Sequence, residues 1–206
     1  MIDSKCHQCR RAGVKLFLKG ARCFSQKCAM VRHPNSPGMH GAKKKRAGSE
    51  FGIQLAEKQK VKRSYGLREA QFRKYFEMAR KKKAVTSAIL AQILETRLDN
   101  TVFRLGFFDS RSQARQAVSH GHFTVNGRRV DIPSYQVKVG DIIVIRTQSA
   151  SKTLFKDLRA AIKKYEPPVW LSLDKEQLKG EVKRMPATED IEMPFDLQLI
   201  TEFYSK

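Results

Sequence analysis

Four cysteines stand close together near the start of the chain, at a spacing typical of a metal site. Cys6 and Cys9 form a C-x-x-C pair. Thirteen residues separate this pair from Cys23, and four more separate Cys23 from Cys28. Two short pairs at such a distance can close a tetrahedral shell, because each pair supplies two thiolates from a tight turn. The spacing suits Zn²⁺ and also a four-iron four-sulfur cluster, and it does not separate the two.

The surroundings of these cysteines favour metal binding. Thiols of an intracellular protein stay reduced, so disulfides are not expected, and unligated thiols are the remaining alternative. His7 lies within the first pair as a substitute ligand. Four cysteines already complete the shell, so the predicted site is structural, with no open position for catalysis. Cationic residues that favour the thiolate form flank the cysteines: Lys5, Arg10, Arg11, Arg22 and Lys27.

The chain also has a large excess of positive charge. Its 206 residues include 41 Lys and Arg against 20 Asp and Glu, a net charge of +21. The first 90 residues hold 23 basic and 5 acidic residues, which is +18 of that charge. RNA is attracted to this density because phosphate contacts release counterions, whereas an anionic membrane surface is the alternative. We expect no membrane span and no secretory signal, since no apolar run is long enough for either.

The first half of the chain, which carries the cysteines and most of the positive charge, is predicted to be mainly helical. Residues 32–49 are rich in Pro, Gly, His and Lys and predict an extended basic loop. A helix is predicted from Ser49 until Gly66 ends it, and a second from Leu67 to about Lys82. Four aromatic residues of this region are predicted to be core residues, with base stacking as the alternative: Tyr65, Phe72, Tyr75 and Phe76.

The pattern in the second half of the sequence predicts two helices followed by a small sheet. Apolar residues recur at helical spacing from Thr86 to Leu105, and Ser110 is placed to cap the next helix. Gly121 is placed to end that helix, and Asn126-Gly127 to join two strands through a tight turn. The remaining predicted elements are strands at 137–139 and 142–145, a helix at 154–165, and strands and loops in the last forty residues.

Several sequence runs resemble a known RNA-binding module. They are Arg97-Leu98-Asp99-Asn100, Arg104-Leu105-Gly106, Ser110 to Gln116, His120-Gly121 and Val125-Asn126-Gly127-Arg128. Further runs extend the match over the chain: Leu16-Phe17-Leu18-Lys19, Pro37 to Gly41, and Tyr204-Ser205-Lys206. Together they resemble the family of bacterial small-subunit ribosomal protein four, in its cysteine-bearing, metal-binding version.

The resemblance implies a structural constituent of the small ribosomal subunit, cytoplasmic and without enzymatic activity. Members bind the 5′ domain of small-subunit rRNA at a helix junction, nucleate subunit assembly and border the mRNA entry channel. The implied partners are rRNA, mRNA and neighbouring ribosomal proteins, with no membrane and no homo-oligomer.

The expected fold class is α+β, in four parts. Residues 1–48 form a four-cysteine metal knuckle and basic loop, and residues 49–94 form a helical domain. Residues 95–160 form the RNA-binding module of two helices and a twisted antiparallel sheet. Residues 161–206 are expected to pack back on the helical domain.

Junction recognition should rest on shape, phosphates and 2′-hydroxyls, for which the fixed fork of arginine is well suited. The alternative for Arg111 and Arg115 is a solvated helix face, and for His120 it is packing in the turn. The predicted rRNA-binding residues are Arg97, Arg104, Arg111, Ser112, Arg115, Gln116, His120 and Arg128. By resemblance, the loop facing mRNA comprises Lys43, Lys44, Lys45 and Arg46. Other basic residues predicted to face RNA are Arg10, Arg11, Arg22, Lys62, Arg63, Arg73, Lys81 and Lys82.

Two other functions have partial support in the sequence. The triplet Arg97-Leu98-Asp99 also surrounds the catalytic aspartate of some pseudouridine synthases, but here it continues an apolar helix pattern and Asp99 is expected to form an ion pair. A zinc-dependent DNA-binding regulator is compatible with the helix spacing at 87–120. Nucleotide hydrolysis and metalloprotease chemistry have no supporting motif.

Overall fold

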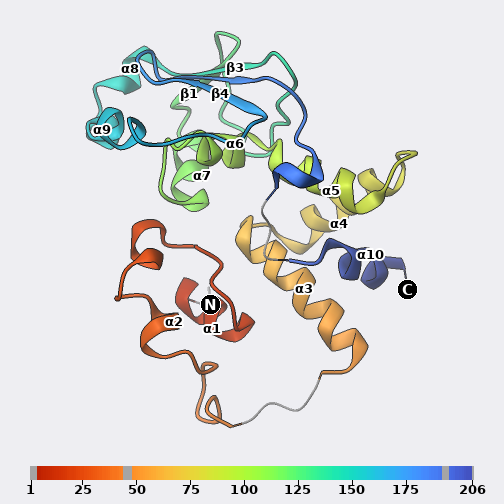
Figure 1. Cartoon of the computed structure of the whole chain (residues 1–206). Helices are drawn as coiled ribbons and strands as arrows, with labels where there is room; N and C mark the ends of the chain where they lie inside the picture. The colour runs from red at the N-terminus through yellow and green to blue at the C-terminus, as the bar shows by residue number, and fades with distance from the viewer. Residues whose placement is uncertain (1–3, 44–47, 192–194, 206) are drawn as a thin grey trace. The chain divides into compact units, whose positions relative to one another are not determined.

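The computed structural model describes residues 4–43, 48–191 and 195–205 (Figure 1). Two compact units divide the chain: residues 1–87 with 193–206, and residues 88–192. We call the first the N-terminal unit and the second the sheet unit. Among the described residues, the longest helices are too short and too polar to cross a membrane.

The N-terminal unit is helical, as the sequence predicts. Its helices are α1 (Lys5–Ala12), the 3₁₀ helix η1 (Gly20–Phe24), α2 (Ala29–Arg32), α3 (Glu50–Ser64), α4 (Glu69–Arg80) and α10 (Leu197–Ser205). The predicted start of α3 is confirmed, and Ser49 is its N-cap, because Ser49 Oγ accepts a hydrogen bond from the Gly52 N–H at 3.2 Å. Gly66 follows α3 with φ +63°, a left-handed conformation that glycine adopts readily and that ends the helix there.

The apolar face of α4 forms the core of this unit. Phe72, Tyr75 and Phe76 are at most 3% exposed, and Tyr65 is 4% exposed. Rings so deeply buried have no face to offer an RNA base. The prediction that these aromatic residues are core residues is therefore confirmed, and the stacking alternative is wrong for them.

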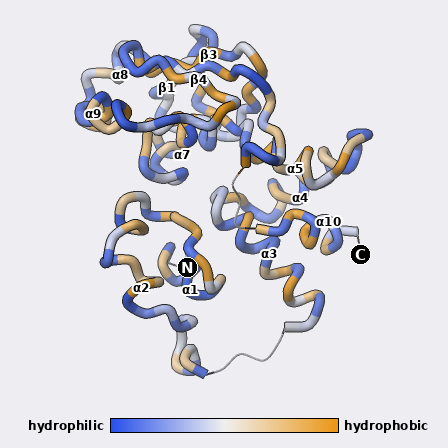
Figure 2. Tube along the Cα trace, in the orientation of Figure 1, coloured by the Kyte–Doolittle hydropathy of each residue, from blue (hydrophilic) through white to orange (hydrophobic). Residues whose placement is uncertain are grey.

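The last helix closes this core. Residues far apart in the sequence meet here, since α10 lies beside α3 in Figure 1 and carries hydrophobic residues coloured orange in Figure 2. Ile200 is fully buried. The Tyr204 ring stacks on the Phe76 ring at 4.7 Å between centroids, and the Phe203 ring lies 5.4 Å from the Phe51 ring. The N-terminal unit is therefore completed by the end of the chain.

The sheet unit combines short helices with one antiparallel sheet. Its helices are α5 (Thr86–Glu95, entering from the N-terminal unit), α6 (Leu98–Arg104), α7 (Arg111–Ser119), α8 (Thr147–Ala150), η2 (Thr153–Phe155), α9 (Leu158–Ile162) and η3 (Thr188–Asp190). Its strands are β1 (Phe123–Val125), β2 (Arg128–Arg129), β3 (Ile142–Ile145), β4 (Leu171–Asp174) and β5 (Lys179–Val182). They are ordered β2-β1-β3-β5-β4.

The register of the sheet follows from a tight turn and close packing. Asn126 and Gly127 both have positive φ, 49° and 78°, as a type I′ hairpin turn requires, and they pair Val125 with Arg128. Further along the sheet, Ile143 pairs with Gly180. A Cβ atom on Gly180 would lie 2.3 Å from the Leu105 side chain, so glycine allows Leu105, the residue after α6, to pack closely on β5.

Local signals around α7 are confirmed. Ser110 Oγ accepts a hydrogen bond from the Gln113 N–H, which is the predicted cap. Gly121 follows the helix with φ +68°, as expected for the glycine that ends it.

The predicted helix from Thr86 to Leu105 is two helices, because long-range bonds interrupt it. Arg97 has ψ of 136°, outside the helical region, and forms an isolated bridge with Gln136. The Leu98 N–H donates to the Tyr135 carbonyl at 2.8 Å, and the Val137 N–H to the Thr96 carbonyl at 2.8 Å. The backbone groups of residues 135–137 are used in this contact, and the strand predicted at 137–139 is not formed.

The segment 161–206 also differs from expectation. β5 pairs with β3, so β4 and β5 extend the sheet of the module. α10, from the end of the same segment, contacts α3. The physical reason is that Trp170, Leu171 and Val182 are buried in the core of the sheet unit.

Candidate nucleic-acid interface

The four cysteines gather around one small cavity. α1 supplies Cys6 and Cys9, η1 supplies Cys23, and Cys28 immediately precedes α2. The other residues lining the cavity are Lys5, Leu18, Lys19, Arg22, Ala29 and Met30. Its volume of about 20 Å³ leaves room for one water-sized atom. Cys9, Cys23 and Cys28 are each buried, and all four cysteines are free thiols.

The electrostatics of this cluster reflect the crowding of the thiols. Burial raises the pKa of the Cys9 thiol, and the nearby sulfurs of Cys23, Cys6 and Cys28 raise it further. A hydrogen bond with the Leu16 backbone acts in the opposite sense. Four sulfurs are a donor set that zinc accepts. Even so, the described part of the chain contains no group of three or more His, Cys, Asp or Glu side chains arranged to hold a metal ion.

A buried carboxylate organises the helices of the module. Glu95, at the end of α5, is fully buried. Arg104 binds it through two hydrogen bonds, of 2.9 Å to Oε2 and 3.0 Å to Oε1. Asn100 Nδ2 donates to Glu95 Oε2 at 2.9 Å. Arg104, predicted to bind rRNA, thus holds the Glu95 carboxylate and keeps 20% of its side chain exposed.

Arg111 joins the same network from α7. Its Nε donates to Asn100 Oδ1 at 2.7 Å, and its Nη2 lies 4.0 Å from Glu95 Oε1. The guanidinium also lies over the Phe103 ring, 4.6 Å from its centroid. The side chain is 20% exposed, so Arg111 positions α7 against α5 and α6 while keeping an edge at the surface.

Asp99 forms a second ionic group nearby. Arg97 binds it through Nε at 3.0 Å and Nη2 at 2.6 Å. The ion pair expected for Asp99 is thus confirmed. Arg97 itself is 1% exposed, so its assignment to the RNA-contacting residues is corrected: it is a structural residue. Arg115 lies 3.8 Å from Asp99 and remains 46% exposed.

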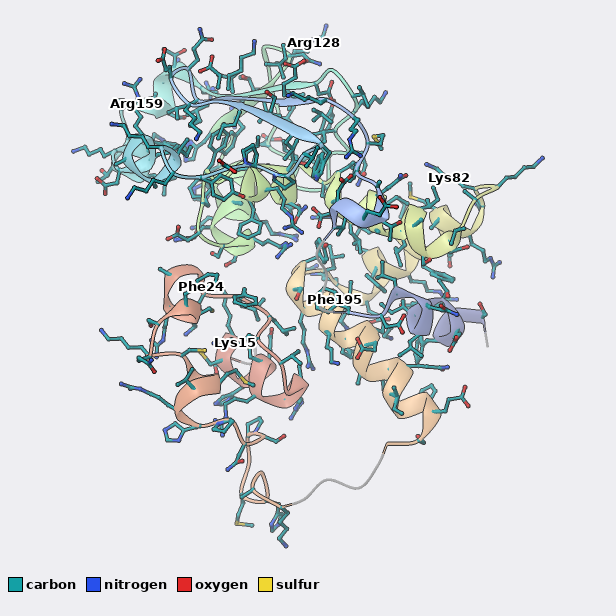
Figure 3. All side chains as sticks on the ribbon, in the orientation of Figure 1. Lys15, Phe24, Lys82, Arg128, Arg159 and Phe195 are labelled. Atoms are coloured by element: carbon teal, nitrogen blue, oxygen red, sulfur yellow. The ribbon has the colours of Figure 1, made fainter. Side chains whose placement is uncertain are left out.

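The outward face of α7 brings the other predicted residues together. Ala114, Ala117 and Val118 are buried, and four predicted contact residues lie on the exposed side of the helix or just after it: Ser112, Arg115, Gln116 and His120. The His120 ring meets the His122 ring edge-on at 5.9 Å. Arg128, on β2, is also exposed and is labelled in Figure 3.

The predicted basic loop is described in part. Lys43 is exposed. Lys44, Lys45 and Arg46 lie outside the described residues. Arg11, Arg22, Lys81 and Lys82 are exposed basic residues elsewhere in the N-terminal unit, and Lys82 is labelled in Figure 3 on the loop after α4.

Other predicted basic residues have partners within the unit. Arg10 Nε donates to the Asn35 carbonyl at 2.8 Å. Arg73 pairs with Glu77 at 3.3 Å, and Lys62 pairs with Glu69 at 2.8 Å. Arg63 is half-buried.

Glu69 is an acidic centre that sequence reasoning missed. Lys58 Nζ lies 2.7 Å from it, and the Tyr204 hydroxyl donates to it at 2.9 Å. Burial alone would raise the pKa of Glu69, but hydrogen bonds from Lys58, Lys62 and Tyr204 outweigh burial and hold it at about 2. Burial and the hydrogen bond to Glu69 raise the pKa of Tyr204. These contacts fasten α10 to α3 and α4.

A basic hollow beside this contact was also missed. Arg73, Phe76, Glu77, Arg80, Lys81 and Tyr204 line a pocket of about 450 Å³. The run of cations that ends α4 was visible in the sequence, but its junction with Tyr204 depends on the docking of α10.

Comparison with known proteins covers the whole chain. Residues 1–95 match the family described as "Ribosomal protein S4/S9 N-terminal domain", and residues 96–143 match "S4 domain". A protein named small ribosomal subunit protein uS4, from Caldicellulosiruptor bescii, is 54% identical over 205 residues, covering 100% of this chain and 98% of the relative. Proteins of the same name are 53% identical in Thermus thermophilus, over 205 residues, and 52% identical in Ruminiclostridium cellulolyticum, over 204 residues. Their coverage is 100% and 99% of this chain, with 98% of each relative.

Proposed function

Since this chain belongs to the family of small ribosomal subunit protein uS4, we propose that it is a non-enzymatic constituent of the small ribosomal subunit that binds rRNA. The observation that carries the proposal is the match to uS4 proteins over nearly the full length of both chains. As in those bacterial relatives, its place is the cytoplasmic ribosome, where it contacts rRNA and neighbouring ribosomal proteins as a single copy.

We propose the outward face of α7 as the part that reads RNA shape. A double-stranded RNA junction presents phosphates and 2′-hydroxyls, and short polar side chains with an arginine fork suit these groups. The face of Ser112, Arg115, Gln116 and His120 has this chemistry. Arg111 holds the face in place through its hydrogen bond to Asn100 and its position 4.0 Å from the buried carboxylate of Glu95.

The proposed target is the helix junction in the 5′ domain of small-subunit rRNA, where binding would nucleate subunit assembly. The test uses the full chain with three substitutions, Arg115→Ala, Gln116→Ala and His120→Ala, which leave Arg111 and the Glu95 network intact. Affinity for the 5′-domain junction should fall far more than affinity for an unrelated RNA duplex of equal length.

Exposed cations of the same unit provide the matched control. Lys156→Ala with Arg159→Ala removes two charges from the surface around α9, where Arg159 is labelled in Figure 3. This variant should bind the junction nearly as the unaltered chain does. Equal losses on junction and duplex in the α7 variant would contradict shape-specific recognition. Equal affinity for a DNA duplex would favour the DNA-binding alternative.

We further propose that the basic loop borders the mRNA entry channel. Exposed Lys43 and the cationic sequence that follows support an electrostatic contact with messenger phosphates. A photocrosslinking amino acid in place of Lys43 should label mRNA downstream of the decoding site in assembled ribosomes. Labelling confined to rRNA would contradict this contact.

Finally, we propose a structural metal at the four cysteines, with zinc as the first expectation and a four-iron four-sulfur cluster as the alternative. The cavity that all four cysteines line supports it, because it brings four sulfurs together from α1, η1 and the residue before α2. Metal binding would remove the thiol protons and hold α1, η1 and α2 together.

Elemental analysis of protein purified without chelators should find one zinc per chain, or iron with matching acid-labile sulfide. Removing the metal should speed hydrogen exchange at the amides of residues 5–32 and leave the sheet unit protected. A sample that contains neither metal and still protects residues 5–32 would rule out the metal.

A further inference from the structure

Two phenylalanine rings stack on the surface of the N-terminal unit. The ring centroids of Phe17 and Phe24 are 5.1 Å apart and their planes differ by 28°. Phe24 is 77% exposed and Phe17 is 39% exposed. Isolated apolar side chains at a surface need no explanation, but a stacked pair presents a continuous apolar surface to water, which is typical of a binding site.

Buried neighbours hold the pair in place. Leu16 precedes Phe17 and is 2% exposed, and Cys23 precedes Phe24 and is 8% exposed. Cys23 Sγ also accepts a hydrogen bond from the Lys19 N–H at 3.3 Å. Both rings are therefore carried by anchored backbone positions.

The backbone at Phe17 is unusual for its side chain. Its φ of +51° is in the left-handed region, which is unfavourable for a bulky residue and favours glycine. Such conformations persist where the surrounding structure enforces them, and they cluster at ligand-binding sites. At position 17 this conformation is combined with a ring that stacks at the surface.

The charge around the rings indicates the ligand. Residues 4–49 contain no Asp or Glu, so every charged side chain in this stretch, apart from the titratable cysteines, is cationic or histidine. Lys19 and Arg22 are exposed, and Lys15 is half-buried. Figure 3 labels Lys15 and Phe24 in the same N-terminal segment. A partner for this surface needs negative charge and a flat apolar face, and an unpaired nucleotide has both.

We propose that the Phe17–Phe24 pair is a stacking platform for an unpaired base of the bound RNA, with Lys15, Lys19 and Arg22 receiving the adjacent phosphates. The proposal rests on the RNA-binding function proposed above and adds a base-contacting site outside the module. Stacking on Phe24 requires no particular base, because every base has a π face.

A fluorescence titration of Phe24→Trp in the full chain tests the stack directly. The native Trp170 is fully buried in the sheet unit, so added quenching reports on the introduced indole. A uridine homopolymer should quench this emission strongly. Inorganic polyphosphate, which has charge but no bases, should bind without comparable quenching. Equal quenching by both polymers, or quenching by neither while binding is observed, would overturn the proposal.

Val169→Trp is the matched control for exposure. Val169 is 73% exposed, close to the value for Phe24, and lies in the segment 161–206 with its net charge of −2. Its emission should change little with the uridine homopolymer. Equal quenching at position 169 would show that the signal arises from collisions rather than from stacking at the phenylalanine pair.

Affinity measurements separate this proposal from the RNA-binding function itself. Phe24→Ala should weaken binding of the uridine homopolymer by roughly fivefold or more, whereas Phe24→Tyr, which keeps an aromatic ring, should bind as the unaltered chain does. Unchanged affinity in Phe24→Ala would overturn the stacking site while leaving RNA binding intact. An unaltered chain that binds no RNA would refute the proposed function instead.

Discussion

In the N-terminal unit, 24 basic residues face 7 acidic ones, whereas in the sheet unit 17 basic residues face 13 acidic ones. The first unit therefore has a net charge of +17 and the second +4. In the sheet unit, buried carboxylates lie beside arginines that reach the surface: Glu95 Oε1 is 4.0 Å from Arg111 Nη2, and Asp99 Oδ2 is 3.8 Å from Arg115 Nη1. The comparison shows that a nearly balanced unit can present a few placed cations, while its highly charged neighbour presents a diffuse positive field.

The largest effect is expected from removing the buried carboxylate of the sheet unit. Glu95→Ala leaves Arg104 without its main partner inside the protein, and breaking one side of a buried pair costs about 3–5 kcal/mol. Urea unfolding of the full chain, followed by the fluorescence of Trp170, should report this loss. Glu77→Gln, at an exposed pair with Arg73, should change stability by roughly 0.5 kcal/mol or less. If both substitutions had similarly small effects, the buried ion pairs of the sheet unit would contribute no more to stability than the exposed pairs of the N-terminal unit.

A smaller loss is expected from crowding the same unit. Gly180→Ala would put a Cβ atom 2.3 Å from the side chain of Leu105, which is fully buried and must therefore repack. Overpacking of this kind costs about 1–3 kcal/mol. The unfolding midpoint of the sheet unit should fall, and the α7 face should lose RNA specificity with it. A variant as stable as the unaltered chain would show that the packing of Leu105 on β5 can relax.

The diffuse field of the N-terminal unit should show mainly in the salt dependence of binding. Lys81→Ala with Lys82→Ala should weaken binding to all RNAs by a similar factor. The slope of log affinity against log salt should fall by about 1 for each phosphate that the variant no longer neutralises. The α7 variant should change this slope less while losing specificity. If the lysine pair instead altered discrimination between RNAs, the division of roles between the two units would be wrong.

The smallest effect concerns the acid stability of the N-terminal unit. Because the folded pKa of Glu69 is about 2, below its ordinary value of 4.5, the folded state favours the charged form. The resulting stabilisation is complete above about pH 4.5 and is lost as the pH falls towards 2. Its size is about 1 kcal/mol or less, because Glu69 is half-exposed. Glu69→Gln should remove this pH dependence, measured by hydrogen exchange in α10. A dependence that survives the substitution would place its origin elsewhere.

The sequence predicted those features that depend on neighbouring residues. Ser49 and Ser110 cap their helices through bonds to residues a few positions away, and Asn126-Gly127 forms its turn from its own conformational preferences. The break at Arg97 was missed because the apolar periodicity runs through it. Contacts with Tyr135 and Gln136, distant in sequence, decide the conformation there.

The candidate site was predictable to a similar extent. The exposed face of α7 follows from helical periodicity, which places Arg115 and Gln116 opposite Ala114 and Ala117. The burial of Arg97 does not follow from periodicity, because its position depends on the acidic partner that it meets inside the fold. The stacked pair of Phe17 and Phe24 was missed because a left-handed phenylalanine has no local sequence signal.

The docking of α10 on α3 has a consequence for biosynthesis. The sheet unit is one continuous segment, residues 88–192, and all of its strands have been synthesised before the chain ends. The N-terminal unit needs Ile200 and Tyr204 to complete its core, although most of it is made first. During translation the order of folding is therefore the reverse of the order of synthesis: the sheet unit can be completed while the N-terminal unit waits for residues 197–205. Until then the apolar side of α4 lacks its cover, and a nascent chain stalled before residue 197 would expose Phe76 to chaperones and proteases.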